Sequence, residues 1–317
     1  MAQNSPPANA ARGRTFVLVH GGFHVGWCWS RVAPLLRARG HTVFTPTLTG
    51  CGERSHQMSA AITLNTFVDD IALMLTWEDL HDVVLVGHSF GGITITGVAD
   101  RMPQRLKQLI YLDSLILPSG QSAFDQLDPA IVQSRLLAAQ ANGSIWIESP
   151  PPDFFGVGKP EDLAFLQGRL TPQPMGAYTS SLKLQHPVAN GLPAVYVHCT
   201  APLYGGLTRT RDWVKASGMQ EVQLATGHDA MVSAPEALTD LLEALAHGGL
   251  APWRPSITGI RLAVDASSAA SDAQPCGDSL RGLPFCGVAL LDRQPARMVD
   301  EFLALVEAQD AVLCAGQ

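Results

Sequence analysis

Short runs of consecutive apolar residues alternate along the chain with stretches whose apolar positions recur every three or four residues. The first pattern is typical of strands buried on both faces, and the second of amphipathic helices. Strands are expected at residues 16–19, 41–46, 83–86, 106–112, 194–199 and 222–224. Helices are expected at residues 30–39, from an N-cap at Asn65 through Leu75, and at residues 93–100 and 235–246.

The alternation of strands and helices predicts an α/β fold with a parallel sheet covered by helices on both faces. Between the fourth and fifth strands lie two further helix-like stretches, residues 130–141 and 160–170, separated by three prolines at 150–152. An insertion of this length inside an α/β core generally has its own structure and covers a site. We therefore expect residues 117–188 to form a helical cap.

The pattern divides the chain into four parts. Residues 14–116 and 189–247 form the expected core, and residues 117–188 the cap. Residues 1–13 are polar and proline-rich, lack the apolar centre of a signal peptide, and predict a disordered tail. Residues 248–317 are rich in Gly, Ala, Ser, Pro and Asp, and predict a C-terminal extension of unknown role.

Composition narrows the class of protein. Hydrophobic residues make up 46% of the 317 and charged residues 15%, which is too apolar for a disordered chain and ample for a large core. The net charge of −7, with no cluster of Lys or Arg, argues against a nucleic-acid partner. No segment has the roughly 20 apolar residues that a membrane span needs. The sequence does not decide between a monomer and a homodimer.

The cysteines indicate a reducing compartment. They are scattered, form no CxxC motif and have no histidine nearby at zinc-ligand spacing. We expect them to be reduced and mostly buried in a cytoplasmic protein without a bound metal, although a disulfide between two of the last three stays open. They are Cys28, Cys51, Cys199, Cys276, Cys286 and Cys314.

The strongest chemical signal is GHSFG at residues 87–91. A GxSxG sequence between an apolar strand and a helix is the setting of a nucleophile elbow, which projects the serine hydroxyl above the sheet edge. We predict Ser89 as a nucleophile. A serine hydroxyl is weak until a base removes its proton. His228, in ATGHDAM after the last core strand, is the predicted base.

The base in turn needs a carboxylate to orient its ring and stabilise its cation. The loop after residues 194–199, where such an acid is usually found, reads TAPLY and has none. Asp113, by contrast, ends the strand QLIYL and should lie at the carboxyl edge of the sheet, where open α/β sheets bind ligands. We predict Asp113 as this acid, with Asp212 as the alternative.

Acyl transfer also requires donors for the developing oxyanion. The residue after the nucleophile, Phe90, should supply one backbone N–H, and the glycine-rich loop HGGF after the first strand should supply the other. Gly22 and Phe23 are the candidates in that loop.

In this order, FVLVHGGFHVGWCW, GHSFGG, LIYLDS and ATGHDAM resemble the motifs of the α/β-hydrolase superfamily, over residues 14–247. They are most similar to a branch with small bacterial esterases, plant methyl-ester esterases of the salicylate-binding type and hydroxynitrile lyases. The resemblance implies the α/β-hydrolase fold, with a mostly parallel sheet and a helical cap, Ser89 as nucleophile, His228 as base, and no cofactor. Some superfamily members carry the acid at the strand-end position of Asp113.

Three other activities of this superfamily fit the residues poorly. The lyases typically carry a threonine after the first-motif histidine and a lysine after the base, to hold cyanide. Gly21 and Asp229 occupy those positions here. Haloalkane dehalogenases and epoxide hydrolases use a carboxylate nucleophile, against which Ser89 argues.

We therefore expect a serine hydrolase that cleaves a small hydrophobic or aromatic carboxylic ester through an acyl-enzyme intermediate. The alternatives are an amidase, a thioesterase or a C–C hydrolase with the same triad, or a ligand-binding receptor on the same fold. Large aromatic residues are candidates for the substrate pocket, although ordinary core packing explains each equally well. They are Trp27, Phe124, Trp146, Phe154 and Phe155.

Overall fold

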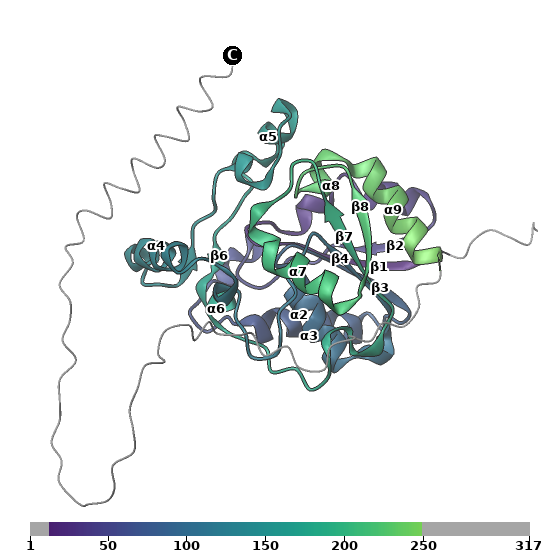
Figure 1. Ribbon diagram of the computed structural model, residues 1–317, viewed down its shortest axis with the longest axis horizontal. Helices are drawn as coiled ribbons and strands as arrows, with labels where there is room; N and C mark the ends of the chain where they lie inside the picture. The colour runs from purple at the N-terminus through teal and green to yellow at the C-terminus, as the bar shows by residue number, and fades with distance from the viewer. Residues whose placement is uncertain (1–12, 249–317) are drawn as a thin grey trace, which may run out of the picture. The chain divides into compact units, whose positions relative to one another are not determined.

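A computed structural model describes residues 13–248 of the chain. Its centre is a six-stranded parallel sheet with the strand order β2-β1-β3-β4-β7-β8 (Figure 1). The prediction of an α/β fold with a parallel sheet is confirmed. The strands are β1 (Thr15–Val19), β2 (Thr42–Phe44), β3 (Val83–His88), β4 (Leu106–Leu112), β7 (Ala194–Cys199) and β8 (Gln220–Leu224).

The predictions for the tail before residue 13 and for the extension after residue 248 lie outside the described residues, as do the last three cysteines. Cys28, Cys51 and Cys199 are buried with free thiols. Within residues 13–248, none of the helices combines the length and the apolar character that crossing a bilayer requires.

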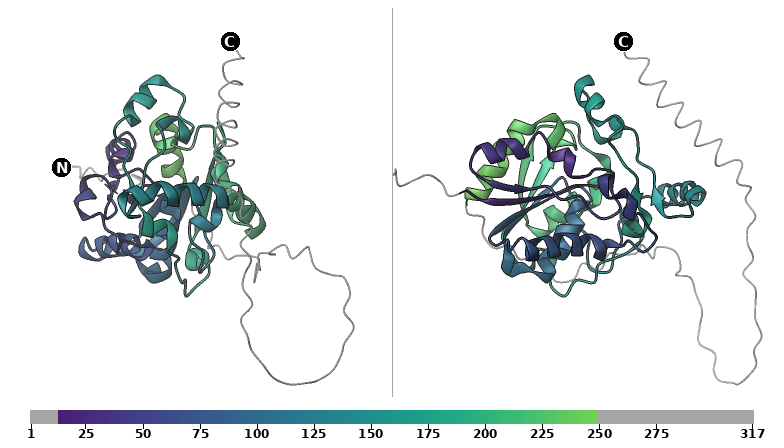
Figure 2. Two further views of the ribbon diagram at one scale, coloured as in Figure 1. Left: turned by 90° about the vertical axis from the view of Figure 1, so that its left-hand side faces the viewer. Right: turned by 180° about the vertical axis from the view of Figure 1, so that it is seen from behind.

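The helices cover both faces of the sheet, because its central strands have no polar face to present to water. Every residue of β3 and β7 is buried. On one face α1 (Ala33–Ala38) packs with α9 (Pro235–His247), and on the other α2 (Leu64–Trp77) packs with α3 (Gly91–Arg101) (Figures 1 and 2). The remaining core helices are α7 (Thr208–Ser217) and α8 (Ala230–Ser233).

The order in which strands are added to the sheet reverses at β1. The chain runs outward from β1 to β2 and then returns to place β3 on the other side of β1, with β4 beyond it. Such a switch point opens a crevice at the carboxyl ends of the strands. The loops that follow β1, β3 and β4 are therefore neighbours, although they lie far apart in the sequence.

The segment between β4 and β7 has structure of its own, as an insertion that covers a site should. It contains α4 (Pro129–Ala139), α5 (Pro160–Leu166), α6 (Met175–Thr179), and an antiparallel pair formed by β5 (Trp146–Ile147) and β6 (Gln173–Pro174). α4 and α5 stand out from the sheet (Figures 1 and 2). α5 ends before the predicted residue 170, because Gln167 leaves the helical region and Gly168 has a φ of +71°.

Helix starts were predicted less well. The N-cap of α2 is Thr63 and not Asn65. The Oγ1 of Thr66 accepts the backbone N–H of Thr63 at 3.1 Å, which satisfies a donor at the helix start, whereas the Oδ1 of Asn65 accepts from Arg101. α1 starts at Ala33 rather than at residue 30, because the chain before it forms a 3₁₀ turn at Gly26–Trp29.

This contact gives a direct test of the start of α2. Thr66→Val keeps the side-chain shape but removes the acceptor for the Thr63 N–H, so it should lower the free energy of unfolding by about 1 kcal/mol in urea denaturation. Thr76→Val on the same helix removes only an exposed hydroxyl that bonds the Ala72 carbonyl, and should change stability by less than about 0.5 kcal/mol. Equal losses in the two variants would contradict the assigned cap.

Candidate active site

Ser89 lies in the sharp turn between β3 and α3. Its φ of +51° is in the left-handed region, which a non-glycine residue adopts at a cost. Glycines beside it permit the turn: a Cβ on Gly87 would lie 2.8 Å from the Gly91 carbonyl oxygen, and one on Gly91 would lie 2.7 Å from that of His20. The turn leaves Ser89 partly exposed above the sheet edge, as a nucleophile elbow requires.

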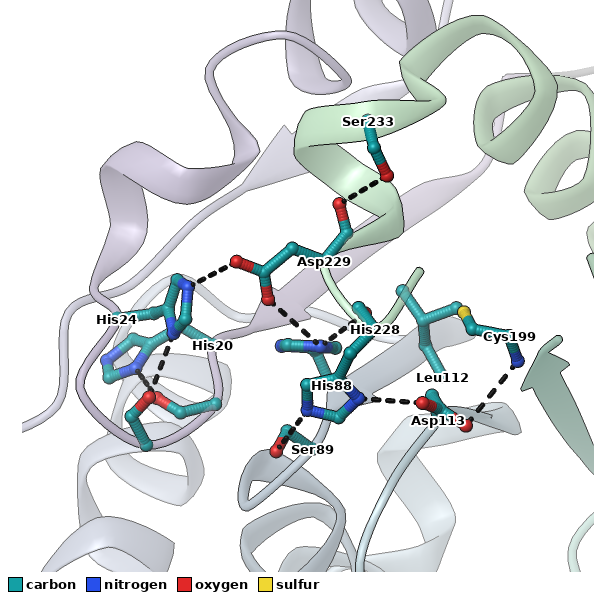
Figure 3. Close-up of polar contacts among 12 residues, drawn as sticks. His20, His24, His88, Ser89, Leu112, Asp113, Cys199, His228, Asp229 and Ser233 are labelled. Atoms are coloured by element: carbon teal, nitrogen blue, oxygen red, sulfur yellow. Dashed lines mark hydrogen bonds and ion pairs between the residues drawn. The ribbon is translucent and has the colours of Figure 1, made fainter. Parts of the chain in front are cut away.

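Three side chains form a hydrogen-bonded chain at this edge (Figure 3). The Oγ of Ser89 lies 2.9 Å from Nε2 of His228, and Nδ1 of His228 lies 2.7 Å from Oδ2 of Asp113. Asp113 and His228 are buried. A carboxylate can only accept hydrogen bonds, so it places the imidazole proton on Nδ1 and leaves the Nε2 lone pair for the serine proton.

The carboxylate that contacts His228 comes from the end of β4 and not from α7. Asp113 directly follows β4, the neighbour of β3, and its Oδ1 also accepts the backbone N–H of Cys199 at 3.4 Å. Asp212, the alternative, is exposed on α7, and the structure does not bring it to the imidazole. Strand order explains the difference, because adjacent parallel strands end at the same edge.

The two loop residues predicted as oxyanion donors differ in their hydrogen bonds. Among the described residues, no hydrogen-bond partner is found for the backbone N–H of Gly22 or of Phe90. The N–H of Phe23 donates instead to Oε1 of Gln173 at 3.1 Å, so the structure favours Gly22 of the two loop candidates. Gly22 and Phe90 are therefore the pair free to bind an oxyanion.

A cavity of about 50 Å³ lies at Ser89 and adjoins an open groove of about 710 Å³, with which it shares part of its lining. Of the predicted aromatic residues, Phe154 and Phe155 line the cavity. Eight residues of the lining were not predicted from the sequence, and among them are Arg135, Tyr178 and Tyr204. The ring of Tyr204 stacks on the imidazole of His228, with centroids 4.0 Å apart and planes at 16°.

The other predicted pocket residues contribute to packing outside the cavity lining. Trp27 packs edge-on against Phe165 at 5.5 Å. Trp146 donates its indole N–H to Glu148. Phe124 lies behind the cavity wall, with its ring 5.6 Å from that of Tyr178. In these three cases core or surface packing, the alternative raised from the sequence, describes the residue.

The chain shares its sequence pattern and its fold with known proteins. A model of the alpha/beta hydrolase family matches residues 16–241. The chain belongs to this family. Over 248 residues, 73% of this chain and 98% of the relative, it is 35% identical to a carbendazim hydrolyzing esterase of Nocardioides sp. (strain SG-4G).

Two solved structures of the family are also similar. One is an extracellular alpha/beta-hydrolase from a Paenibacillus species, described as sharing structural and functional homology with tobacco salicylic acid binding protein 2. It is 26% identical, with a TM-score of 0.64 over 74% of this chain and 98% of that one. A methylesterase from Arabidopsis is 25% identical, with a TM-score of 0.59 over 74% and 99% of the two chains. With esterases among its relatives, this family member is a carboxylic-ester hydrolase.

The position after the base distinguishes this hydrolase from the lyases that its motifs resemble. Asp229 is fully buried and offers no cation. A Cβ on Gly21 would lie 2.7 Å from the Cβ of Ser89, so a threonine there would require the nucleophile to shift. Both residues argue against a cyanide-binding site.

Asp229 instead forms a second buried His–Asp pair (Figure 3). Nε2 of His24 lies 2.9 Å from Oδ2 of Asp229, and Nδ1 of His24 lies 2.8 Å from the Gly22 carbonyl oxygen. Both partners are acceptors, so both ring nitrogens donate and His24 is an imidazolium. Burial opposes this charge, but the charge and hydrogen bond of Asp229 outweigh it and raise the pKa of His24.

Two neighbouring histidines are neutral. His20 donates from Nδ1 to the Gly21 carbonyl and accepts the Leu48 N–H at Nε2, and burial lowers its pKa to about 4. His88 donates from Nε2 to the His228 carbonyl, and burial together with the charge of His228 lowers its pKa well below the usual range. No second positive charge therefore lies against the catalytic imidazole from these two rings.

One group of side chains in residues 13–248 has the spacing of a metal site. Atoms of His41, Glu243 and His247 lie within 4.8 Å of one another at the amino edge of the sheet, away from Ser89. Both ring nitrogens of His41 are already engaged, by the Arg14 N–H and by Glu243, and Arg39 also pairs with Glu243. These contacts engage His41 and Glu243, whereas Nε2 of His247 is buried without a hydrogen-bond partner in residues 13–248.

The charge state of His24 predicts a pH-dependent stability. Its pKa is raised on folding, so the pair stabilises the protein fully below pH 6.5, and this contribution is lost as pH rises through the folded pKa. Asp229→Asn should therefore cost several kcal/mol at pH 6 and less at pH 9 in chemical denaturation. Asp79→Asn, in an exposed pair with Arg105, should have little effect on stability at either pH. A loss for Asp229→Asn that is the same at both pH values would mean that His24 is neutral.

Proposed function

We propose that the chain is a serine hydrolase that cleaves carboxylic esters through an acyl-enzyme intermediate. The observation that carries this proposal is the continuous chain of hydrogen bonds from Asp113 through His228 to Ser89. A nucleophile, a base and a group that orients the base are the parts that this mechanism needs.

In the first half of the reaction, Nε2 of His228 takes the Ser89 proton while Oγ attacks the ester carbonyl carbon. The carbonyl oxygen gains negative charge and faces the backbone N–H groups of Gly22 and Phe90. Asp113 remains a carboxylate and stabilises the imidazolium. The ester C–O bond then breaks, the proton on Nε2 passes to the leaving alkoxide, and the acyl group stays on Ser89.

In the second half, water repeats the sequence on the acyl-enzyme. Nε2 of His228 takes a proton from the water, the hydroxide adds to the acyl carbon, and the carbonyl oxygen returns to the same two N–H groups. The intermediate collapses with return of the proton to Oγ of Ser89, and a carboxylic acid is released. The proton of Ser89 moves along the hydrogen bond to Nε2 of His228 that the resting site already makes. The proton of the water moves to the same nitrogen once a water has bound beside it.

The cavity favours a small hydrophobic or aromatic ester. Its lining is mostly apolar and aromatic, so it would desolvate an apolar group and exclude water from the acyl-enzyme. The residues that give it this character are Phe23, Phe90, Leu115, Ala123, Leu127, Phe154, Phe155 and Leu207. No observation favours amide, thioester or C–C substrates over esters, and the assembled triad supports turnover over a receptor function.

Three variants test the mechanism, with 4-nitrophenyl esters from acetate to decanoate as substrates. Ser89→Ala should lower kcat about 10⁵-fold or more, and Asp113→Asn about 10⁴-fold, since the amide favours the wrong tautomer of His228. Asp212→Asn is the matched control and should stay within about twofold, because Asp212 is exposed on α7.

Folding of each variant is checked by circular dichroism. A folded wild-type protein that turns over none of these esters would contradict the proposed function. A collapse of activity in Asp212→Asn, with Asp113→Asn active, would contradict the assignment of the acid.

A further inference from the structure

One charged side chain lies among those that line the cavity at Ser89. Arg135 comes from α4 of the insertion, and every other lining residue is apolar or uncharged. Its guanidinium carbon is 6.0 Å from the ring centroid of Phe23 and 5.7 Å from that of Tyr178. The charged end of the side chain, and not only its aliphatic stem, therefore reaches the aromatic wall of the cavity.

No carboxylate compensates this charge within ion-pair distance in the described part of the chain. Other arginines have such partners, for example Arg31 with Asp162 and Arg54 with Asp70. Asp128 and Asp153 line the adjoining groove, but both are exposed and neither forms an ion pair with Arg135. Burial of a charge is costly unless it is paired, so a half-buried guanidinium beside an apolar cavity favours a counter-charge from a ligand.

The two tyrosines beside Arg135 do not supply that counter-charge. Burial raises the pKa of Tyr178 to about 12, although the charge of Arg135 opposes this, and burial also raises the pKa of Tyr204. Both phenols are therefore neutral near pH 7. The hydroxyl of Tyr178 lies beside the oxyanion loop, because a Cβ on Gly22 would lie 2.6 Å from its oxygen. The ring of Tyr178 is therefore near the oxyanion loop at its hydroxyl, and the guanidinium carbon of Arg135 lies 5.7 Å from its centroid.

We infer that Arg135 forms an anion subsite, and that the enzyme prefers esters whose acyl part ends in a carboxylate, such as half-esters of dicarboxylic acids. This inference rests on the proposed function, because it places the acyl chain on Ser89 with its far end at the guanidinium. An arginine binds a carboxylate through two parallel N–H···O bonds. Since the other end of the acyl chain is bound to Ser89, the chain must be long enough to span the cavity. The aromatic wall then contacts the methylene groups between the two ends.

The test compares two 4-nitrophenyl esters of the same length, the half-ester of adipic acid and the heptanoate. In the wild type, kcat/KM for the half-ester should exceed that for the heptanoate. Arg135→Met replaces the aliphatic stem with an unbranched apolar side chain, removes the charge, and should lower this ratio about 10- to 100-fold, mainly through the KM of the half-ester. Arg135→Lys should retain part of the preference, since it keeps the charge without the planar fork.

The matched control is Arg169→Met. Arg169 also lies over an aromatic ring of the insertion, 4.4 Å from the centroid of Phe165, but does not line the cavity. This variant should leave the ratio unchanged, and added salt should reduce the ratio in the wild type but not in Arg135→Met.

An unchanged ratio in Arg135→Met, or an equal loss for both esters, would overturn the anion subsite, because the arginine would then be only a packing residue. Turnover of the heptanoate by the folded wild type separates that outcome from failure of the proposed function, in which neither ester would be cleaved.

Discussion

The buried hydrogen bond between Asp113 and His228 is the interaction on which the rest of the site depends. It is made without competition from solvent, since Asp113 is fully enclosed and His228 nearly so. A carboxylate in that position would be costly unless its oxygens were satisfied, and the imidazole and the Cys199 N–H satisfy them. The imidazole in return acquires one tautomer and one orientation, held further by the stacked ring of Tyr204. Only then does its free nitrogen face Ser89.

The loop that carries the base also holds the oxyanion loop. His228 and Asp229 are adjacent in the chain, and their side chains contact opposite partners, Ser89 in one case and His24 in the other. Since His24 in turn bonds the Gly22 carbonyl, the loop that contains Gly22 is tied to the loop that carries His228. Ser89, His228 and the loop of Gly22 therefore belong to one connected network, in which a shift of one loop would displace the other.

The sequence predicted the parts of the site that follow from the parallel sheet. Ser89 and Asp113 end neighbouring strands, and the rule that such ends share an edge places them together without any knowledge of side-chain packing. Contacts across the insertion follow no such rule. The side chain of Gln173 accepts the hydrogen bond of the Phe23 N–H, although the two residues are 150 positions apart. Neither Tyr178 nor Arg135 lies in a motif, so no local pattern could reveal these residues. The pair of Thr63 and Thr66 at the start of α2 was visible in the sequence, and its spacing could have corrected the choice of Asn65.

The charge states of the buried groups near His228 explain how several histidines can lie close together in the protein core. The charge of His24 is balanced by Asp229, and burial keeps His20 and His88 neutral. What remains beside His228 is a single uncompensated carboxylate, Asp113, and a single negative charge is what the imidazolium needs when it forms. If His88 were charged, its ring, 4.7 Å from that of His228, would oppose proton transfer from Ser89. The core thus supplies a fixed electrostatic environment for the reaction. Arg135 lies on the inserted segment, so its replacement would alter the preference for substrates and leave that environment unchanged.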